Sequence, residues 1–251
     1  ACTDCEAGRY CRGIEWKTEG LQIHYELHHE QSSGWDNIAL PGSQYDATVF
    51  GATYDSVEQA YNLGLSMYAT VNFQTSVTAV PKLSMEVLVR PAGIGGRQWV
   101  ITPDMSGFAR SIMISEIYTA SCSSNCWSNR LGFGAGDFYH SEVAGVAGQW
   151  HHLVATWDER SEGKLYLNGQ LIRTQAGLGT SNFDSTLWIG RAANSELAVD
   201  DGTKIKLVRV YSNVLTAAEV QQNYLSTSSY STTAPSSNTC PAGYHAPATG
   251  S

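Results

Sequence analysis

Charge is scarce in this 251-residue sequence, because Asp, Glu, Lys and Arg together make up only 15% of it. Basic residues are rarer than acidic ones, and the formal net charge is −8. Nucleic acids and anionic membrane surfaces attract basic protein faces, so we expect neither as a partner. No apolar run approaches the length of a transmembrane helix, so we also expect no membrane insertion.

Long helical patterns are scarce as well, whereas strand-like runs broken by glycine-rich turns recur along the chain. The composition agrees, with 24 glycines, 13 tyrosines and 7 tryptophans. Many strands with one short helix predict an all-β, two-sheet antiparallel sandwich or jelly roll. Residues 56–65 have one turn of helical spacing, and we expect a short helix or a loop there. The expected strands are 21–27, 84–89, 98–102, 110–118, 130–133, 150–157, 164–167, 170–174, 186–189 and 204–210.

One short helix is expected near the C-terminal end of this series of strands. Thr216, followed three residues later by Glu219, forms the capping-box pattern that is typical of a helix start. Val220, Tyr224 and Leu225 follow with helical spacing and predict its apolar face.

Two adjacent histidines, His151 and His152, lie in the strand-like run GQWHHLVATWD. Successive residues of a strand point to opposite faces, so these two histidines cannot share one metal ion or one proton relay. The run leads through a charged turn to GKLYLNGQLI, in which Asn168-Gly169 predicts a type I′ hairpin. A histidine acquires a catalytic role only beside positioned partners, so we expect sheet packing rather than catalysis.

The six cysteines lie in clusters near the two ends and in one internal loop. The Cys2/Cys5 pair lacks the second half that a zinc site would need, whereas an even count in such segments favours disulfides. We therefore expect an oxidising setting and a secreted or cell-surface protein. Cys122 and Cys126 are expected to close a local disulfide. The other four allow three pairings, which stay open: Cys2, Cys5, Cys11 and Cys240.

Composition divides the chain into four segments. Residues 1–13 are a Cys-rich leader, and residues 14–226 carry the strands and turns. Residues 227–239 form a Ser/Thr-rich spacer, which cannot build a core, and residues 240–251 begin a second Cys-rich segment. The sequence starts at Ala1 without an initiator methionine or a signal peptide, so we interpret it as a mature or excised fragment.

Catalytic motifs are missing from the sequence. A retaining glycosidase needs two carboxylates about 5 Å apart, which a Glu-x-Asp or Glu-x-Glu triplet in a strand would supply. No such triplet occurs, and Glu86, Glu116 and Glu142 each lack a carboxylate two or four positions away. A Gly-x-Ser-x-Gly motif and a phosphate-binding glycine loop are also absent, so we expect no enzymatic activity.

Two acidic loops are the candidates for a metal site. Asp36, Asn37 and Asp46 lie in GWDNIALPGSQYDA, and Asp200 and Asp201 lie in ELAVDDGTK. Calcium takes oxygen ligands from carboxylates, amides and backbone carbonyls, usually on loops, so Ca²⁺ is the cofactor that these loops predict. The competing interpretation is that the same residues form turns.

Tryptophans outside the regular strands are the candidates for ligand binding. Trp35, Trp99 and Trp127 lie in loops or at strand ends, where an aromatic ring can reach solvent. Aromatic faces bind sugars, so we expect these three to contact a glycan; the competing interpretation is that they pack as lids. The other four alternate with aliphatic residues and are expected in the core: Trp16, Trp150, Trp157 and Trp188.

Five segments, in this order and at these spacings, resemble the laminin G-like, concanavalin A-like jelly roll of the pentraxin-related type. They are LSMEVLVRP, GQWHHLVATWD, GKLYLNGQLI, LWIGR and IKLVRVYSNVLTAAEVQQNY. The resemblance covers about residues 21–226 and implies that the strand with the two histidines belongs to the sheet core. The flanks CTDCEAGRYC and CPAGYHAPATGS resemble Cys-rich repeats of ephrin-receptor-like modules, which implies neighbouring extracellular domains in the same chain.

The resemblance also bears on the calcium site. Members of the family often carry an acidic residue in the first loop, where this chain has Asp46, and their first and last strands are neighbours. They often carry acidic residues in the last strand, where this chain has Lys206 and Leu207. We therefore expect Lys206 to neutralise Asp46 in place of a cation.

Two function classes follow from these observations. The first is a non-enzymatic extracellular recognition module that binds a glycan or a protein partner in adhesion or matrix contact. The second is a structural module of an extracellular filament, matrix or wall. The fold implied by the resemblance most often serves binding, so recognition ranks first. A solvent-facing aromatic residue beside carboxylate or amide groups would favour it further.

Overall fold

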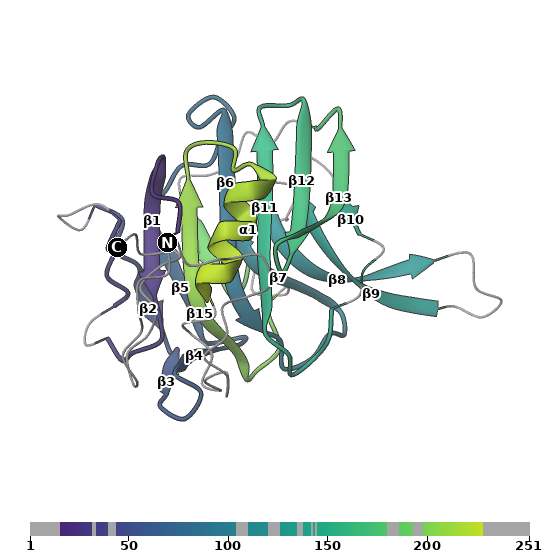
Figure 1. Ribbon diagram of the computed structural model, residues 1–251. Helices are drawn as coiled ribbons and strands as arrows, with labels where there is room; N and C mark the ends of the chain where they lie inside the picture. The colour runs from purple at the N-terminus through teal and green to yellow at the C-terminus, as the bar shows by residue number, and fades with distance from the viewer. Residues whose placement is uncertain are drawn as a thin grey trace, which may run out of the picture.

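A computed structural model of the chain describes residues 16–31, 34–39, 44–103, 110–119, 126–134, 138–141, 143, 145–179, 186–192 and 198–227. These residues form two stacked antiparallel sheets and one helix (Figure 1). The expected all-β, two-sheet antiparallel sandwich with a short C-terminal helix is confirmed. Within the described residues, no helix is long and apolar enough to cross a membrane.

The eight-stranded sheet has the order β13-β12-β11-β6-β15-β4-β3, and β1 also pairs with β15. The long strand β15 pairs with β4 through its first residues and with β1 through its last, so the first and last strands are neighbours, as expected. The strands of this sheet are β1 (Leu21–Glu26), β3 (Thr53–Asp55), β4 (Ala60–Leu63), β6 (Lys82–Arg90), β11 (His151–Asp158), β12 (Glu162–Leu167), β13 (Gln170–Ala176) and β15 (Thr203–Tyr211).

The seven-stranded sheet has the order β10-β9-β8-β7-β14-β5-β2. Strand β2 therefore lies at one edge of this sheet, next to β5 and then β14. The strands are β2 (Thr48–Phe50), β5 (Tyr68–Val71), β7 (Arg97–Thr102), β8 (Ser111–Thr119), β9 (Cys126–Gly134), β10 (Phe138–His140) and β14 (Leu187–Ile189).

The main core lies between the two sheets, and the period of two along each strand fills it. On β6 and β11, Val87, Val89, Leu153 and Trp157 point inward and are fully buried. Val154 points to the opposite, outer face of the same sheet, where it belongs to a second buried cluster. Helix α1 (Ala217–Ser226) crosses this outer face in front of β6, β11 and β15 (Figure 1), so the eight-stranded sheet is covered on both sides.

Helix α1 begins as the sequence predicts. The Thr216 hydroxyl accepts a hydrogen bond from the Glu219 backbone N–H at 3.3 Å, and the Glu219 carboxylate accepts one from the Thr216 N–H at 2.8 Å. Val220 is fully buried against the sheet, whereas Tyr224 and Leu225 are only partly buried. The capping box is confirmed, and the buried face extends further than the apolar pattern indicates.

The hairpin between β12 and β13 also forms as predicted. Asn168 and Gly169 have φ values of 49° and 79°, both in the left-handed region that a type I′ turn requires. The Asn168 side chain also accepts a hydrogen bond from the His152 N–H at 2.9 Å, which fixes the turn to strand β11.

Five short strands were not predicted from the sequence. Each has only three or four residues: β2, β3, β4, β5 and β10. Alternation cannot be recognised over so few positions. The expectation of a helix or loop at residues 56–65 is wrong for its second half. Gln59 has a positive φ of 51°, which breaks the helical spacing, and the next four residues pair with both β3 and β15 as strand β4.

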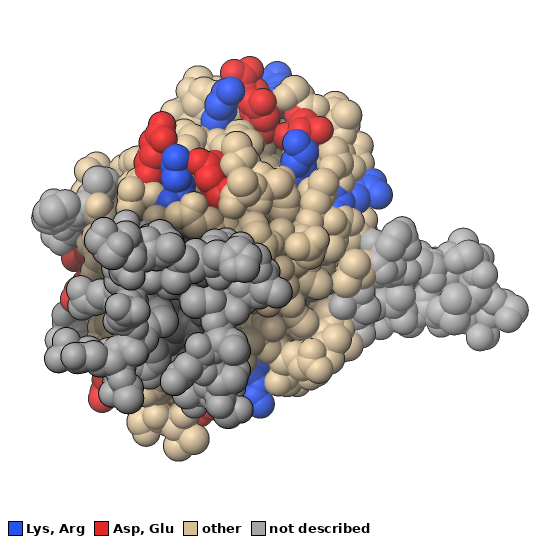
Figure 2. Space-filling view, viewed as in Figure 1, with Lys and Arg blue, Asp and Glu red and all other residues tan. Residues whose placement is uncertain are grey.

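Charged side chains on the face shown in Figure 2 gather along its upper rim, where β6, β11 and β12 begin or end. The ion pairs Lys82–Asp158 at 3.4 Å and Lys164–Glu162 at 2.5 Å belong to these strands. The two signs alternate along the rim, so this face carries no field of a single sign.

Candidate functional site

The two adjacent histidines face opposite sides of the eight-stranded sheet, as the strand period predicts. His151 points inward beside the core, and its Nε2 lies 3.0 Å from the Val146 carbonyl oxygen and 3.1 Å from the Val146 nitrogen. His152 points outward beneath helix α1, where its Nε2 donates a hydrogen bond to Glu86 at 2.9 Å. The two side chains are thus engaged with different neighbours on different faces.

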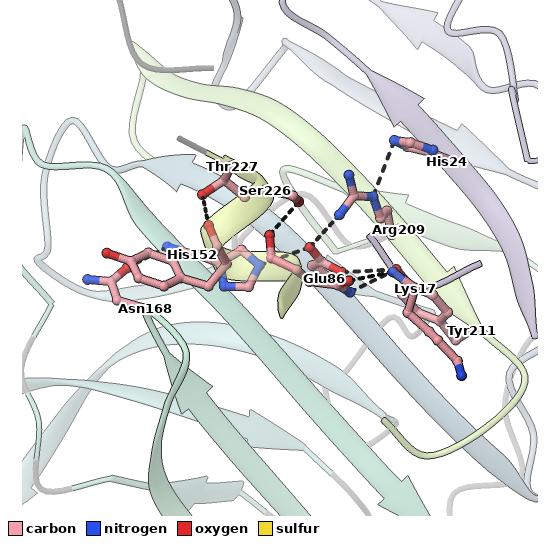
Figure 3. A network of polar contacts seen from close by, with 11 residues as sticks. Lys17, His24, Glu86, His152, Asn168, Arg209, Tyr211, Ser226 and Thr227 are labelled. Atoms are coloured by element: carbon pink, nitrogen blue, oxygen red, sulfur yellow. Dashed lines mark hydrogen bonds and ion pairs between the residues drawn. The ribbon is translucent and has the colours of Figure 1, made fainter. Parts of the chain in front are cut away.

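Glu86 on β6 is the centre of a buried polar network on that outer face (Figure 3). One carboxylate oxygen accepts hydrogen bonds from Arg209 and His152, each at 2.9 Å. The other oxygen accepts from Asn223 of α1 at 2.7 Å and from the Tyr211 hydroxyl at 3.2 Å. Burial alone raises the pKa of Glu86, but Arg209 and then the hydrogen bond from His152 outweigh it and lower this pKa to about 2.

Arg209 connects this carboxylate to a neutral histidine and to an aromatic cover. Burial, reinforced by the charge of Arg209, lowers the pKa of His24 to about 3. The neutral His24 ring can therefore accept a hydrogen bond from Arg209 Nε, at 3.2 Å. Trp16 lies over the Arg209 guanidinium at 4.7 Å and meets the His24 ring edge-on at 5.0 Å. Glu86, Arg209, His24 and His152 are all buried, so these titratable groups are not accessible to a dissolved substrate in this conformation.

The first acidic loop is held by hydrogen bonds within the protein. Asn37 is buried, its side-chain oxygen accepts from the His24 N–H at 2.8 Å, and its side-chain nitrogen donates to the Gln22 carbonyl at 2.9 Å. The Asn37 N–H donates to Asp46 at 2.8 Å. Asp36 and Asp46 are both exposed. Asn37 thus has a structural role in this loop, while the two carboxylates remain accessible.

The second acidic loop contacts a different part of the chain. Asp200 accepts a hydrogen bond from the Gln98 side chain at 3.0 Å, and Asp201 accepts one from the Leu65 N–H at 3.0 Å. Both aspartates are exposed. Among the described residues, no three His, Cys, Asp or Glu side chains gather closely enough to hold a metal ion. Calcium binding by either loop stays a prediction.

Lys206 lies against an aromatic ring, and its expected neutralisation of Asp46 stays a prediction. Its ammonium lies 4.6 Å from the centroid of the Trp150 ring, and its side chain is buried. Burial lowers the pKa of Lys206, and the negative charge of Glu58 opposes this effect. A β-bulge between Ile205 and Leu207 changes the direction of side chains at this point in β15, which a strict alternation of the strand did not anticipate.

The tryptophans predicted to reach solvent are placed differently from that expectation. Trp35 is fully buried in the core between the sheets, and Trp99 is 1% exposed in a small cluster with Met113 and Ala192. The premise that these two rings reach solvent is therefore wrong, because neighbouring segments close over both. Trp127 lies in β9, but its side chain is outside the described residues.

The six cysteine side chains lie outside the described part of the structure. Cys126 is the first residue of β9, and its side chain is outside the described residues. The remaining five cysteines also lie outside the described part of the chain: Cys2, Cys5, Cys11, Cys122 and Cys240. The expected disulfides and the Cys-rich flanks therefore stay predictions.

A row of stacked side chains crosses the outer face of the seven-stranded sheet. Phe50 on β2 lies directly opposite Tyr68 on β5, with ring centroids 4.7 Å apart and ring planes 17° apart. Trp188 on β14 continues the row, 5.6 Å from Tyr68. The Arg191 guanidinium lies 4.3 Å from the centroid of Tyr68 and 5.6 Å from that of Trp188. We call these four residues the aromatic ladder.

The aromatic ladder points away from the core. Val49, Ala69, Leu187 and Ile189, which precede or follow its members on the same strands, all pack inward. Phe50 is 41% exposed, and the other three members are partly exposed. The ladder thus brings three partly exposed aromatic side chains into contact on one face of the sheet.

The sequence contained part of the signal for this ladder. Trp188 lies between Leu187 and Ile189, and we read its alternation with aliphatic residues as a core position. In a strand the middle residue of such a triplet faces away from its two neighbours, so LWI indicated an outward ring. The partnership of Phe50 with Tyr68 was not accessible, because neither β2 nor β5 was recognised as a strand.

Comparison with known families gives one match. The profile of the Laminin_G_3 family, described as the concanavalin A-like lectin/glucanases superfamily, matches residues 63–221. A search of curated protein sequences found no match.

Solved structures share the fold at low sequence identity. The binding domain of botulinum neurotoxin serotype D is 12% identical, with a TM-score of 0.60 over 83% of this chain and 52% of that one. The Trypanosoma rangeli sialidase is 16% identical, with a TM-score of 0.60 over 85% of this chain and 34% of that one. The chain spans about half the length of the toxin binding domains that it matches.

A third structure is similar over almost its whole length. Domain 4 of AbnA, an extracellular arabinanase from Geobacillus stearothermophilus in complex with arabinotriose, is 16% identical, with a TM-score of 0.57 over 81% of this chain and 98% of that one. Such identities show a shared fold, and the family profile covers more than half of the chain. The chain therefore belongs to the concanavalin A-like lectin/glucanases superfamily.

Proposed function

We propose that this domain is a non-catalytic recognition module that binds a glycan on the outer face of its seven-stranded sheet. The observation that carries the proposal is the aromatic ladder, in which Phe50, Tyr68, Trp188 and Arg191 form a partly exposed row across three adjacent strands. Apolar ring surface with a few polar groups at its border is the usual composition of a small-molecule site. Sugars combine apolar C–H faces with hydroxyl groups and so match such a surface.

The similar structures support a binding role. The similar toxin structure is a binding domain, and the similar arabinanase domain holds arabinotriose. Catalysis has less support, because the Glu86 carboxylate is fully buried and engaged by four partners. A typical glycosidase needs an accessible pair of carboxylates at a suitable separation.

The proposed setting is the cell surface or the extracellular matrix, with a glycan or an extracellular protein as partner. The six cysteines support an oxidising compartment, and the Cys-rich flanks would connect the domain to its neighbours in a longer chain. A structural module of a filament or wall is the alternative. That role predicts self-association of the domain without affinity for sugars.

Calorimetric titration with a panel of oligosaccharides tests the proposal. The panel contains arabinotriose, cellotriose, maltotriose and the acidic trigalacturonate, each titrated into the wild type and into Tyr68→Ala. We expect at least one sugar to bind the wild type, and Tyr68→Ala to weaken that binding about tenfold, because the Tyr68 ring supports Phe50 and Arg191 in the aromatic ladder.

Leu171→Ala is the matched control, because Leu171 is 50% exposed on edge strand β13 of the other sheet. This variant should bind as the wild type does, and thermal melting should show that both variants are folded. Absence of binding by the wild type to every sugar, or equal binding by Tyr68→Ala, would contradict the proposed function. Self-association of the sugar-free wild type in sedimentation would then favour the structural alternative.

A further inference from the structure

The aromatic ladder has one open end, at Phe50. Tyr68 is covered on one side by the Phe50 ring and on the other by the Arg191 guanidinium, because β5 lies between β2 and β14. Its two faces are therefore already occupied. Phe50 comes from edge strand β2 and is 41% exposed, so the ring face turned away from Tyr68 is the one that a ligand can stack on.

Exposed side chains alternate with core residues in β2 and in the two residues before it. Ala47 and Val49 pack toward the core, and the alternate residues Asp46, Thr48 and Phe50 are exposed. Asp46 precedes Phe50 by four residues, which corresponds to about 13 Å of extended chain. An exposed carboxylate, a hydroxyl and an aromatic ring thus follow one another along the segment that ends in edge strand β2.

Asp46 is held in position while part of its carboxylate stays accessible. One oxygen accepts the Asn37 N–H at 2.8 Å, and the main chain is fixed by the bridge between Ala47 and Trp35. A carboxylate offers about four acceptor sites, so this single hydrogen bond leaves most of them for a ligand. Sugar hydroxyls are donors that such an ionised acceptor binds strongly.

We propose that the ligand is a neutral oligosaccharide that lies along β2, with one sugar ring stacked on Phe50 and hydroxyls of another bound to Asp46. This inference rests on the proposed function and names the ligand class of the same surface. A span of about 13 Å requires more than one sugar unit. An acidic sugar in this position would meet the Asp46 carboxylate, and like charges at close range repel each other.

Arg191 does not reverse this preference for a neutral ligand. Its guanidinium lies on the far side of Tyr68 from Phe50, and its Nε and Nη1 donate to the carbonyls of Ala192 at 3.1 Å and Leu65 at 3.2 Å. Among residues 46–50, which lead to the open ring face, Asp46 is the charged one, and it is exposed.

The test compares neutral cellotriose and arabinotriose with trigalacturonate, titrated into the wild type, Phe50→Ala, Phe50→Trp, Asp46→Asn and the control Leu171→Ala in the presence of chelator. We expect at least one neutral trisaccharide to bind at least about tenfold more tightly than trigalacturonate. Phe50→Ala should weaken that binding about tenfold and Asp46→Asn several-fold. Phe50→Trp, which keeps a ring face, and Leu171→Ala should retain it.

The possible failures are distinguishable. If the wild type binds a sugar and Tyr68→Ala weakens that binding, while Phe50→Ala and Asp46→Asn bind normally, the placement along β2 is wrong and the proposed function stands. Preference for trigalacturonate, or loss of binding in chelator, would also overturn the inference, because direct contact with Asp46 requires neither an anionic sugar nor a metal ion. No binding of any sugar by the wild type would overturn both proposals. Thermal melting identifies any variant that fails to fold.

Discussion

Glu86 shows at the scale of one residue how a buried charge is made compatible with a sheet protein. Its carboxylate has no exposed surface, and it accepts hydrogen bonds from four side chains on three elements, β11, β15 and α1. Arg209 supplies the opposite charge, and the hydrogen bond from Asn223 links the carboxylate to helix α1. The sequence did not reveal this role, because Glu86 in SMEVLV follows the strand period like any outward polar residue.

Substitution of Glu86 by Gln should destabilise the fold strongly. The amide keeps the shape of the carboxylate but leaves Arg209 buried without its opposite charge, which typically costs about 3–5 kcal/mol. Urea unfolding at neutral pH measures the loss. Glu58→Gln is the matched control, because Glu58 pairs with Arg90 at 2.8 Å on the partly exposed surface, where such a pair contributes less than about 1 kcal/mol. Equal losses in the two variants would show that the buried network is not a significant source of stability.

At the scale of elements, the long strands and the helix were predictable, and the short strands were not. Strands β6, β11 and β15 each have eight or nine residues, enough for the period of two to appear. The helix start at Thr216 follows from local hydrogen bonding alone. Strands β2 and β5 depend on their neighbours in the sheet, so the partnership of Phe50 with Tyr68 requires the tertiary structure.

The tryptophans were misassigned for the same reason. Loop position suggested exposure for Trp35, but the loop folds back through the Trp35–Ala47 bridge and places the ring in the core. Trp188 lies in a strand and was expected in the core, yet it is half-buried on the outer face. Whether a residue lies in a loop or in a strand does not predict its burial. Burial depends on which face of the sheet other segments cover, and that is decided by the whole fold.

The β12–β13 hairpin gives a prediction at this scale. Gly169→Ala should destabilise the protein by about 1 kcal/mol or more, because φ is 79° at this position and an added Cβ would lie 2.2 Å from Gln221 of helix α1. Thermal melting measures the effect. Gly95→Ala is the control, since nothing lies within 4 Å of a Cβ placed there and its φ is not in the left-handed region. A melting temperature for Gly169→Ala equal to that of the control would refute this account of the turn.

The two outer faces of the sandwich differ at the scale of the whole molecule, within the described residues. The outer face of the eight-stranded sheet is covered by α1 and Trp16, and its buried polar side chains bond to one another around Glu86. The outer face of the seven-stranded sheet carries the aromatic ladder and the exposed side of β2. The sequence indicated the family and a binding role, and the structure moves the candidate site from loop tryptophans to this second face.

Mapping of backbone amide chemical shifts during titration with a neutral trisaccharide that binds in calorimetry tests this division most directly. The account predicts saturable shifts at residues 46–50 of the β2 segment and at the ladder positions on β5 and β14, with α1 and β11 unchanged. Perturbations confined to α1, β11 or the β12–β13 hairpin, with β2 and β5 unaffected, would contradict it and place recognition on the opposite face.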